Sequence, residues 1–284
     1  MKTLKNVMVC CFAVALVAAC GDDDDNGDPD GTTDVIEEVV EEVIGDVVEE
    51  GGCPPDDATH IYINVMGAVQ SLEPGGNVEG LLVAAVSPLA ALMPGDPELI
   101  ETTVSGADGM FMFECLDVGT VTLGLVLLVD DDPSGSDDDY FPTGTGVAAF
   151  EEADGSDKVD IPDAAPFSLS HTLIGGLETL ITGLDTATDG LVMGLIVDGT
   201  THAPIDGARL LVESSGDAAP VSYPAADLTA LETDDNTSAN GMFVFNGAVT
   251  LGPAFIAEAS GYTFSGHQAA SKANFCYFSM HASE

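Results

Sequence analysis

The sequence predicts an all-β protein made of two small Greek-key β-sandwiches, joined by an acidic loop and a short helix and preceded by an acidic, partly helical or disordered tether. Three observations support this fold class. The chain has 284 residues, of which 45% are hydrophobic, enough to form real cores. Short apolar runs alternate with clusters of Gly, Pro, Asp and Asn, as strands alternate with turns. Finally, one pattern of residues occurs twice along the chain.

The charge of the chain is strongly negative. There are 49 Asp and Glu residues against 5 Lys and Arg, so the formal net charge is −44. A nucleic-acid-binding surface needs a basic patch that displaces counterions from phosphates. Beyond the N-terminal segment the basic residues are Lys158, Arg209 and Lys272. Nucleic acid is therefore excluded as a partner.

Residues 1–19 have the pattern of a secretory signal peptide. Lys2 and Lys5 precede an apolar stretch that ends at Ala19, and this stretch is shorter than the ~20 residues of a membrane-spanning helix. Residues 16–21 read LVAACG, which resembles the lipobox of bacterial lipoproteins. The resemblance implies that Cys20 is lipidated and anchors the chain to a membrane of the bacterial envelope, the outer rather than the inner. The alternative is an ordinary signal peptide with a chance cysteine.

Residues 20–57 are predicted to form a tether. From Gly21 to Asp57 there are 16 acidic residues and no basic ones. Within it, residues 35–50 repeat two apolar and two acidic residues, a period that places the apolar residues on one side of a helix. Two interpretations remain open for this stretch: a zipper with a partner helix, and a solvated stalk that is partly helical.

The tether also contains a candidate Ca²⁺ site. The ligand spacing of an EF-hand-type loop occurs at Asn26, Asp28, Asp30 and Glu37. The stretch departs from that pattern, because Asn26 replaces the usual first Asp and no helix fits between Cys20 and Asn26. The alternative is diffuse cation binding by the acidic segments.

Three blocks of the repeat occur in the same order in both copies. The matches pair residues 66–69 with 193–196 and 78–83 with 205–210 at an offset of 127, and 105–113 with 237–245 at an offset of 132. The change of offset corresponds to one loop insertion. Duplication of a β module therefore explains the pattern.

Each copy has a turn followed by a strand. Gly109 follows an Asp, and Gly241 follows an Asn. Asp-Gly and Asn-Gly are both dipeptides that form turns with positive φ. The alternation after each turn places two phenylalanine rings on one face of a strand. We expect these four rings to lie in the cores: Phe111, Phe113, Phe243 and Phe245.

The order of these motifs resembles that of the carboxypeptidase regulatory-like domain. The second copy carries VDGTTHAPIDGA at residues 197–208, SANGMFVF at 238–245 and a closing ASGY at 259–262. The resemblance implies a prealbumin-like sandwich of about seven strands. The first copy lacks the Pro before Gly80 and the Gly-Tyr ending. We assign the sandwiches to residues 58–130 and 190–284, and an acidic linker to residues 131–189.

The predicted linker contains one candidate helix. Apolar residues recur at helical spacing from Leu169 to Leu184, with Ser170 or Ser168 as a possible N-cap. The helix either binds a partner or packs on one of the sandwiches.

The sequence contains no convincing catalytic motif. The five histidines are scattered and lack ligand spacing: His60, His171, His202, His267 and His281. Residues 144–149 imitate a dinucleotide-binding glycine pattern, but the pattern does not follow a strand. No catalytic residue is therefore predicted.

The cysteines suggest one disulfide. With Cys20 lipidated, Cys53, Cys115 and Cys276 remain in an oxidising compartment. We favour a Cys53–Cys115 pair, which would attach the tether to the first sandwich. Plain buried cysteines are the alternative, particularly for Cys276.

These features predict a non-enzymatic, lipid-anchored cell-envelope protein that presents two β-sandwich modules for structural or binding roles, with an envelope protein or a glycan as partner. The alternative is a calcium-dependent adhesion or carbohydrate-binding surface protein. With no Trp and 5 Tyr, the chain offers few aromatic platforms for a glycan. A third class is a hydrolase with an unrecognised site.

Overall fold

A computed structural model describes residues 52–57, 59–73, 75–76, 78–93, 97–119, 124–131, 139–148, 159–212, 221–245, 247–249 and 254–284. Several predicted features lie outside the described residues: the signal peptide, Cys20 and residues 35–50. The candidate calcium ligands lie outside them as well, namely Asn26, Asp28, Asp30 and Glu37. None of the helices in the described part of the chain is long and apolar enough to cross a membrane.

The described chain is mostly β-structure. Its first part contains β1 (Tyr62–Ala68), β2 (Gln70–Ser71), β3 (Leu82–Val86), α1 (Pro88–Leu92), β4 (Leu99–Val104), β5 (Met110–Asp117), β6 (Leu125–Asp130), β7 (Tyr140–Phe141), β8 (Thr143–Ala148), β9 (Ile161–Ala164) and β10 (Phe167–Ser170). Its second part contains α2 (His171–Leu180), α3 (Thr186–Asp189), β11 (Leu191–Val197), β12 (Arg209–Val212), β13 (Val221–Ser222), β14 (Met242–Phe245), β15 (Ala254–Glu258), β16 (His267–Gln268) and β17 (Cys276–Ala282). The predicted all-β sandwich class is confirmed.

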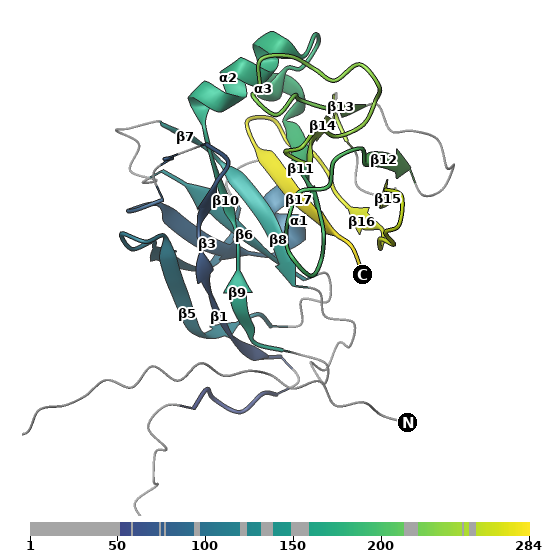
Figure 1. Ribbon diagram of the computed structural model, residues 1–284. Coiled ribbons are helices and arrows are strands. Elements are labelled where there is room, and N and C mark those ends of the chain that lie inside the picture. The colour runs from purple at the N-terminus through teal and green to yellow at the C-terminus, as the bar shows by residue number, and fades with distance from the viewer. Residues whose placement is uncertain are drawn as a thin grey trace, which may run out of the picture. The chain divides into compact units, whose positions relative to one another are not determined.

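One eight-stranded sheet contains strands from both copies of the repeat (Figure 1). Its strand order is β13-β14-β11-β17-β8-β6-β3-β4, and three smaller sheets have the orders β5-β1-β9, β2-β10-β7 and β12-β15-β16. Strand β17 runs parallel to both β11 and β8, and so connects the two halves of the large sheet.

The duplication is visible in the strand registers. Gly67 of β1 lies opposite Phe111 of β5, and Gly194 of β11 lies opposite Phe243 of β14. These pairs are related by the two offsets found in the sequence. Strands β3 and β12 are related by the first offset, and each pairs with an antiparallel strand, β3 with β6 and β12 with β15. The two copies therefore share strand pairing as well as sequence.

A buried hydroxyl makes the same hydrogen bonds in each copy. Ser105 Oγ donates to the Val78 carbonyl at 2.6 Å and accepts from the Leu81 amide at 3.0 Å. In the second copy, the hydroxyl of Thr237 donates to the Ile205 carbonyl at 2.7 Å and accepts from the Ala208 amide at 3.0 Å. In both copies this hydroxyl satisfies backbone groups where a loop enters a strand.

The two copies contribute non-equivalent strands to the eight-stranded sheet. The first copy supplies β3 and β6, and its β1 and β5 form the separate sheet that packs over them. The second copy supplies β11 and β14, and its β12 and β15 lie in the separate sheet. The eight-stranded sheet is therefore made from unlike halves of one repeated module.

Residues 131–189, which the sequence analysis assigns to a linker, contain strands that complete the first sandwich. Strand β8 pairs with β6, and β9 pairs in parallel with β1, as β17 pairs with β11 in the second copy. The assignment of this range as a linker is therefore too broad. Strands β8 and β9 read TGTGVA and IPDA, and neither sequence shows the apolar alternation that predicts a strand.

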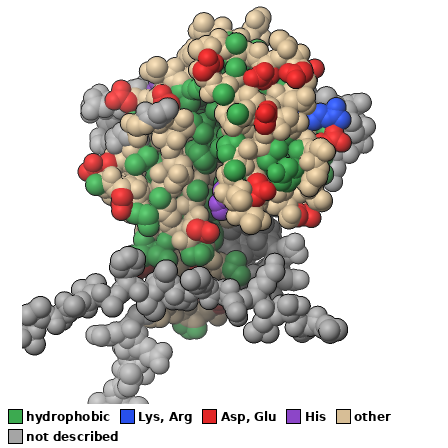
Figure 2. Space-filling view, in the orientation of Figure 1, with side chains coloured by type: hydrophobic (Ala, Val, Ile, Leu, Met, Phe, Trp, Pro, Cys, Tyr) green, Lys and Arg blue, Asp and Glu red, His purple; other side chains and the backbone are tan. Residues whose placement is uncertain are grey.

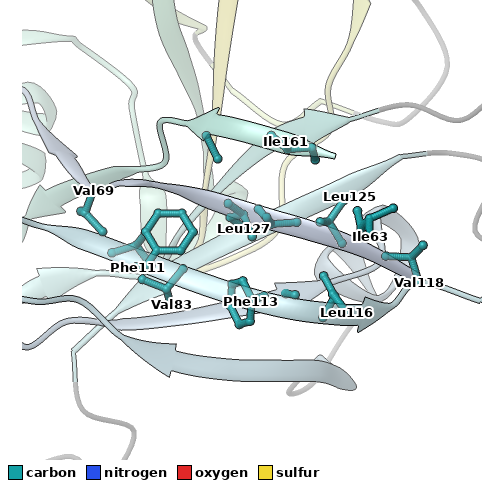
Figure 3. Packing of buried hydrophobic residues seen from close by; sticks show 14 of the residues in the cluster. Ile63, Val69, Val83, Phe111, Phe113, Leu116, Val118, Leu125, Leu127 and Ile161 are labelled. Atoms are coloured by element: carbon teal, nitrogen blue, oxygen red, sulfur yellow. The ribbon is translucent and has the colours of Figure 1, made fainter. Parts of the chain in front are cut away.

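The core of the first sandwich lies between β1, β5 and β9 on one side and β3 and β6 on the other (Figure 3). Phe111 and Phe113 point into it, with Leu127 and Ile161 in the same cluster. In the second copy Phe243 and Phe245 are also buried, which confirms all four expected core rings. The turn glycines have positive φ as predicted, 77° at Gly109 and 66° at Gly241.

The predicted helix between the copies is present as α2. Ser170, one of the two expected caps, accepts a hydrogen bond from the Leu173 amide at 3.0 Å. Leu173, Ile174 and Leu177 are buried in a cluster with residues of β11, β14 and β17. Of the two interpretations left open for this helix, packing on a sandwich is thus the one observed.

Candidate functional site

The candidate site is a groove of about 450 Å³ over the joint between the two halves of the eight-stranded sheet. Residues of α1, β6, β8, β16 and β17 line it. Leu89, Leu92 and Met280 make the groove largely apolar, while His267 and Ser279 supply polar groups. Figure 2 shows one face of the molecule, where acidic side chains lie scattered among apolar ones.

Two glycines of β8 allow aromatic rings to lie close to the sheet beside this groove. A side chain at Gly144 would come within 2.6 Å of the Phe275 ring, and one at Gly146 within 2.9 Å of the Tyr277 hydroxyl. Both glycines of the pattern that imitates a dinucleotide-binding loop lie within strand β8. Their role is to make room for Phe275 and Tyr277.

Near the groove, the structure brings together two histidines that the sequence analysis treats as scattered. The ring centroids of His267 and His281 are 4.6 Å apart, and His281 also contacts the Phe243 ring. His281 lies on the same side of β17 as Ser279, because the two residues are separated by one position. Histidine spacing contains no signal for this pair, since it depends on how β16 and β17 are placed.

The His281 ring is buried and electrically neutral near neutral pH. Burial, and then the charge of His267, lowers the pKa of His281 to about 3. Burial also lowers the pKa of His267. His281 Nε2 lies 3.2 Å from Ser279 Oγ, and within the described chain His281 Nδ1 has no hydrogen-bond partner.

This arrangement is a poor nucleophile-activating pair. A serine nucleophile needs a histidine base with a pKa near the working pH and an acceptor that orients the other ring nitrogen. The His281 pKa is far below neutral, and Nδ1 lacks that acceptor in the described residues. The described residues also contain no group of three or more His, Cys, Asp or Glu that could hold a metal ion.

Cys53 and Cys115 are joined by a disulfide with Cα atoms 5.1 Å apart, the pairing that the sequence analysis favours. Asn64 supports this region, because its side-chain oxygen accepts the Cys115 amide at 3.0 Å. Cys276 is a buried free cysteine, and burial raises the pKa of its thiol. Its environment is that of a core residue.

Comparison with known proteins identifies no family. No family model matches the chain, and no curated protein matches it. The similarity to a carboxypeptidase regulatory-like domain therefore stays a prediction.

Solved structures with some similarity include two bacterial pilins. The shaft pilin SpaA of Lactobacillus rhamnosus GG is 11% identical, with 79% of this chain and 98% of that chain covered and a TM-score of 0.22. The Bacillus anthracis TIE protein is 8% identical, with 78% and 34% covered and a TM-score of 0.22. The minor pilin GBS52 of Streptococcus agalactiae is 12% identical, with 78% and 96% covered and a TM-score of 0.22. Similarity at this level carries no inference about function.

Proposed function

We propose that this chain is a non-enzymatic, lipid-anchored protein of the bacterial cell envelope, in which the two joined β-sandwich modules have a structural or binding role. The observation that carries the proposal is the continuous eight-stranded sheet, whose strands come from both copies and whose two faces are packed by buried clusters. Such a sheet is a rigid body suited to presenting surfaces. The LVAACG pattern at residues 16–21 supports the anchor.

The anchor is tested by fractionating cells that express Cys20→Ala. We expect this variant in the soluble fraction, because an acyl chain contributes ~0.8 kcal/mol per buried methylene and the strongly acidic chain is repelled by anionic lipid. Cys11→Ala is the matched control, since it removes a cysteine from the same N-terminal region, and it should remain with the membranes. A Cys20→Ala protein that still sediments with membranes at high salt would show that the anchor is misassigned.

The non-enzymatic part of the proposal is tested at the Ser279 hydroxyl. A fluorophosphonate probe labels serine nucleophiles that a histidine activates. We expect no labelling of Ser279 and no hydrolysis of ester or peptide substrates, because the His281 pKa of about 3 makes that ring a weak base. Labelling that disappears in both Ser279→Ala and His281→Gln would instead favour a hydrolase.

A further inference from the structure

The outer face of the β5-β1-β9 sheet carries three exposed methionines. Met66 of β1 lies directly opposite Met112 of β5, and Met110 is on the same side of β5. Their exposed fractions are 40% for Met66, 51% for Met110 and 48% for Met112. The residues that alternate with them on β5, Phe111 and Phe113, point into the core. Core packing therefore does not explain these three residues, which we call the methionine cluster.

The strand pairing allows the three sulfur atoms to meet. Directly opposite residues of antiparallel strands have Cβ atoms about 4.5–5.5 Å apart, and residues two positions apart on one strand share a face at a spacing of ~7 Å. The methionine side chain is unbranched and has three rotatable bonds, so its sulfur atom can take many positions. The sulfur atoms of Met66, Met110 and Met112 can therefore contact a single ion.

The second copy uses the equivalent positions differently. By the offsets of the repeat they are Met193, Met242 and Val244, whose exposed fractions are 0%, 3% and 0%. All three belong to a buried apolar cluster. Met112 thus stands where the second copy has a valine. A third sulfur donor is present only in the copy where these positions face the solvent.

Two carboxylates lie beside the methionine cluster. Met66 and Met112 line a hollow of about 560 Å³ together with Glu114 and Asp160. Glu114 is on the same side of β5 as Met112, two positions further along the strand. Asp160 is held against β1, because its carboxylate accepts the Asn64 amide at 2.7 Å. Thioethers are neutral, so these two negative charges favour a cation in the hollow.

The donor atoms favour a soft metal ion. Cys115 lines the same hollow, but its sulfur is joined to Cys53 in the disulfide, so the soft donors that remain are thioethers. Thioether ligands select Cu(I), whereas Ca²⁺ and Mg²⁺ prefer oxygen ligands. Zn²⁺ sites use thiolate, imidazole and carboxylate ligands, and no group of three or more such residues occurs in the described part of the chain.

We propose that the methionine cluster is a binding site for Cu(I), in which the thioethers of Met66, Met110 and Met112 are the ligands. Glu114 and Asp160 supply negative charge beside the ion. Binding involves no oxidation or reduction, because the ion enters and leaves as Cu(I). Since all three ligands are exposed, the site can exchange its ion with its surroundings.

Titration of the full chain with Ag⁺ tests this proposal, because Ag⁺ is a soft monovalent ion that keeps its oxidation state in air. The methyl resonances of isotopically labelled methionines report on each sulfur atom. We expect the signals of Met66, Met110 and Met112 to shift together and to reach saturation near one equivalent of Ag⁺. The signals of the buried Met193 and Met242 should not shift. Ca²⁺ and Mg²⁺ should shift none of these signals.

Two leucine substitutions separate the cluster from exposed methionines in general. Met112→Leu removes one thioether but keeps an apolar side chain of similar volume, so the thermal midpoint without metal should not change. We expect this variant to bind Ag⁺ about tenfold or more weakly, a loss typical of altered metal sites. Met93→Leu is the matched control, because Met93 is 62% exposed but lies at the end of α1, and it should keep the original affinity.

The charge beside the ion is tested separately with Glu114→Gln, which should weaken Ag⁺ binding less than Met112→Leu does. Unchanged affinity in Met112→Leu would overturn the proposal. So would a shift of the Met93 signal equal to the shifts of the cluster, because it would show that Ag⁺ binds any exposed thioether. Signals of the cluster that depend on protein concentration and not on Ag⁺ would instead assign this face to a second copy of the chain.

Discussion

At the scale of single residues, the hydroxyls of Ser105 and Thr237 have the same structural role in the two copies. Each bridges a backbone carbonyl and a buried backbone amide. We expect Ser105→Ala and Thr237→Val each to lower the free energy of unfolding by about 1–3 kcal/mol, because the amide is left buried without an acceptor. Urea denaturation monitored by circular dichroism measures this change.

The control for these substitutions is Thr229→Val. Its hydroxyl also makes a side-chain hydrogen bond, to Asp227, but the pair is exposed and water can replace the lost partner. We expect a change within about 0.5 kcal/mol. Equal losses at Thr229 and Thr237 would contradict the role assigned to the buried hydroxyl.

The neutral ring of His281 makes stability depend on pH. Its pKa is about 3 in the folded chain, whereas an unfolded histidine has a pKa near ~6.5. Between these two pH values the unfolded chain binds more protons at this residue than the folded chain does. The stability that His281 contributes is therefore fully present above the unfolded pKa, and it is lost as the pH falls toward 3. The slope from this group is at most about 1.4 kcal/mol per pH unit.

Substitution of His281 should therefore flatten the pH profile. We expect His281→Gln to lower the stability at pH 7 but to lose less stability than the unmodified chain between pH 7 and pH 5. The acidic residues titrate in both proteins, so the difference between the two profiles isolates His281. Parallel profiles from urea denaturation at each pH would show that His281 is not the group responsible.

At the scale of elements, glycines in a strand and in a helix have opposite roles. A side chain at Gly194 of β11 would overlap the Ser279 carbonyl of β17, whereas one at Gly175 of α2 would meet nothing within 4 Å. We expect Gly194→Ala to destabilise the protein by roughly 1–3 kcal/mol or more, and Gly175→Ala to stabilise it by roughly 0.5–1 kcal/mol. Thermal denaturation compares both. Destabilisation by Gly175→Ala would contradict the open surroundings of α2.

The elements that sequence could predict depend on local signals. Helix α2 has a 3.6-residue apolar period and a serine cap, and the turns at Gly109 and Gly241 need only a residue that tolerates positive φ. In the same way, the repeat places four phenylalanine rings in the cores without knowledge of the sheets.

Other features depend on contacts between distant segments, which local patterns do not encode. Strand β9 reads IPDA, and it is a strand because β1 pairs with it. The groove and the His267–His281 pair arise where β16 and β17 meet. The two copies supply non-equivalent strands to the eight-stranded sheet. The alternation of apolar and polar residues within one strand therefore cannot show which face of each copy is packed against another part of the chain.

At the scale of the whole molecule, the parallel pairing of β17 with β8 changes the expected unfolding behaviour. Two separate sandwiches would unfold independently. Here β17 is hydrogen-bonded on one edge to β11 of the second copy and on the other edge to β8, which pairs with β6 of the first copy. Unfolding one copy therefore exposes an internal edge of the other, which couples the two.

This coupling predicts a single unfolding transition that a substitution in either copy shifts. Gly241 has a φ of 66°, and a side chain there would come within 2.6 Å of the Ile196 carbonyl, so Gly241→Val should destabilise the protein by roughly 1–3 kcal/mol. The chain has no Trp, so the methyl resonances of isotopically labelled methionines serve as local probes, Met66 for the first copy and Met193 for the second. We expect the folded-state signals of Met66 and Met193 to disappear at the same denaturation midpoint. Gly241→Val should lower this midpoint by the same amount for both probes. If Met193 alone responds while Met66 keeps its original midpoint, the two copies are energetically independent despite the shared sheet.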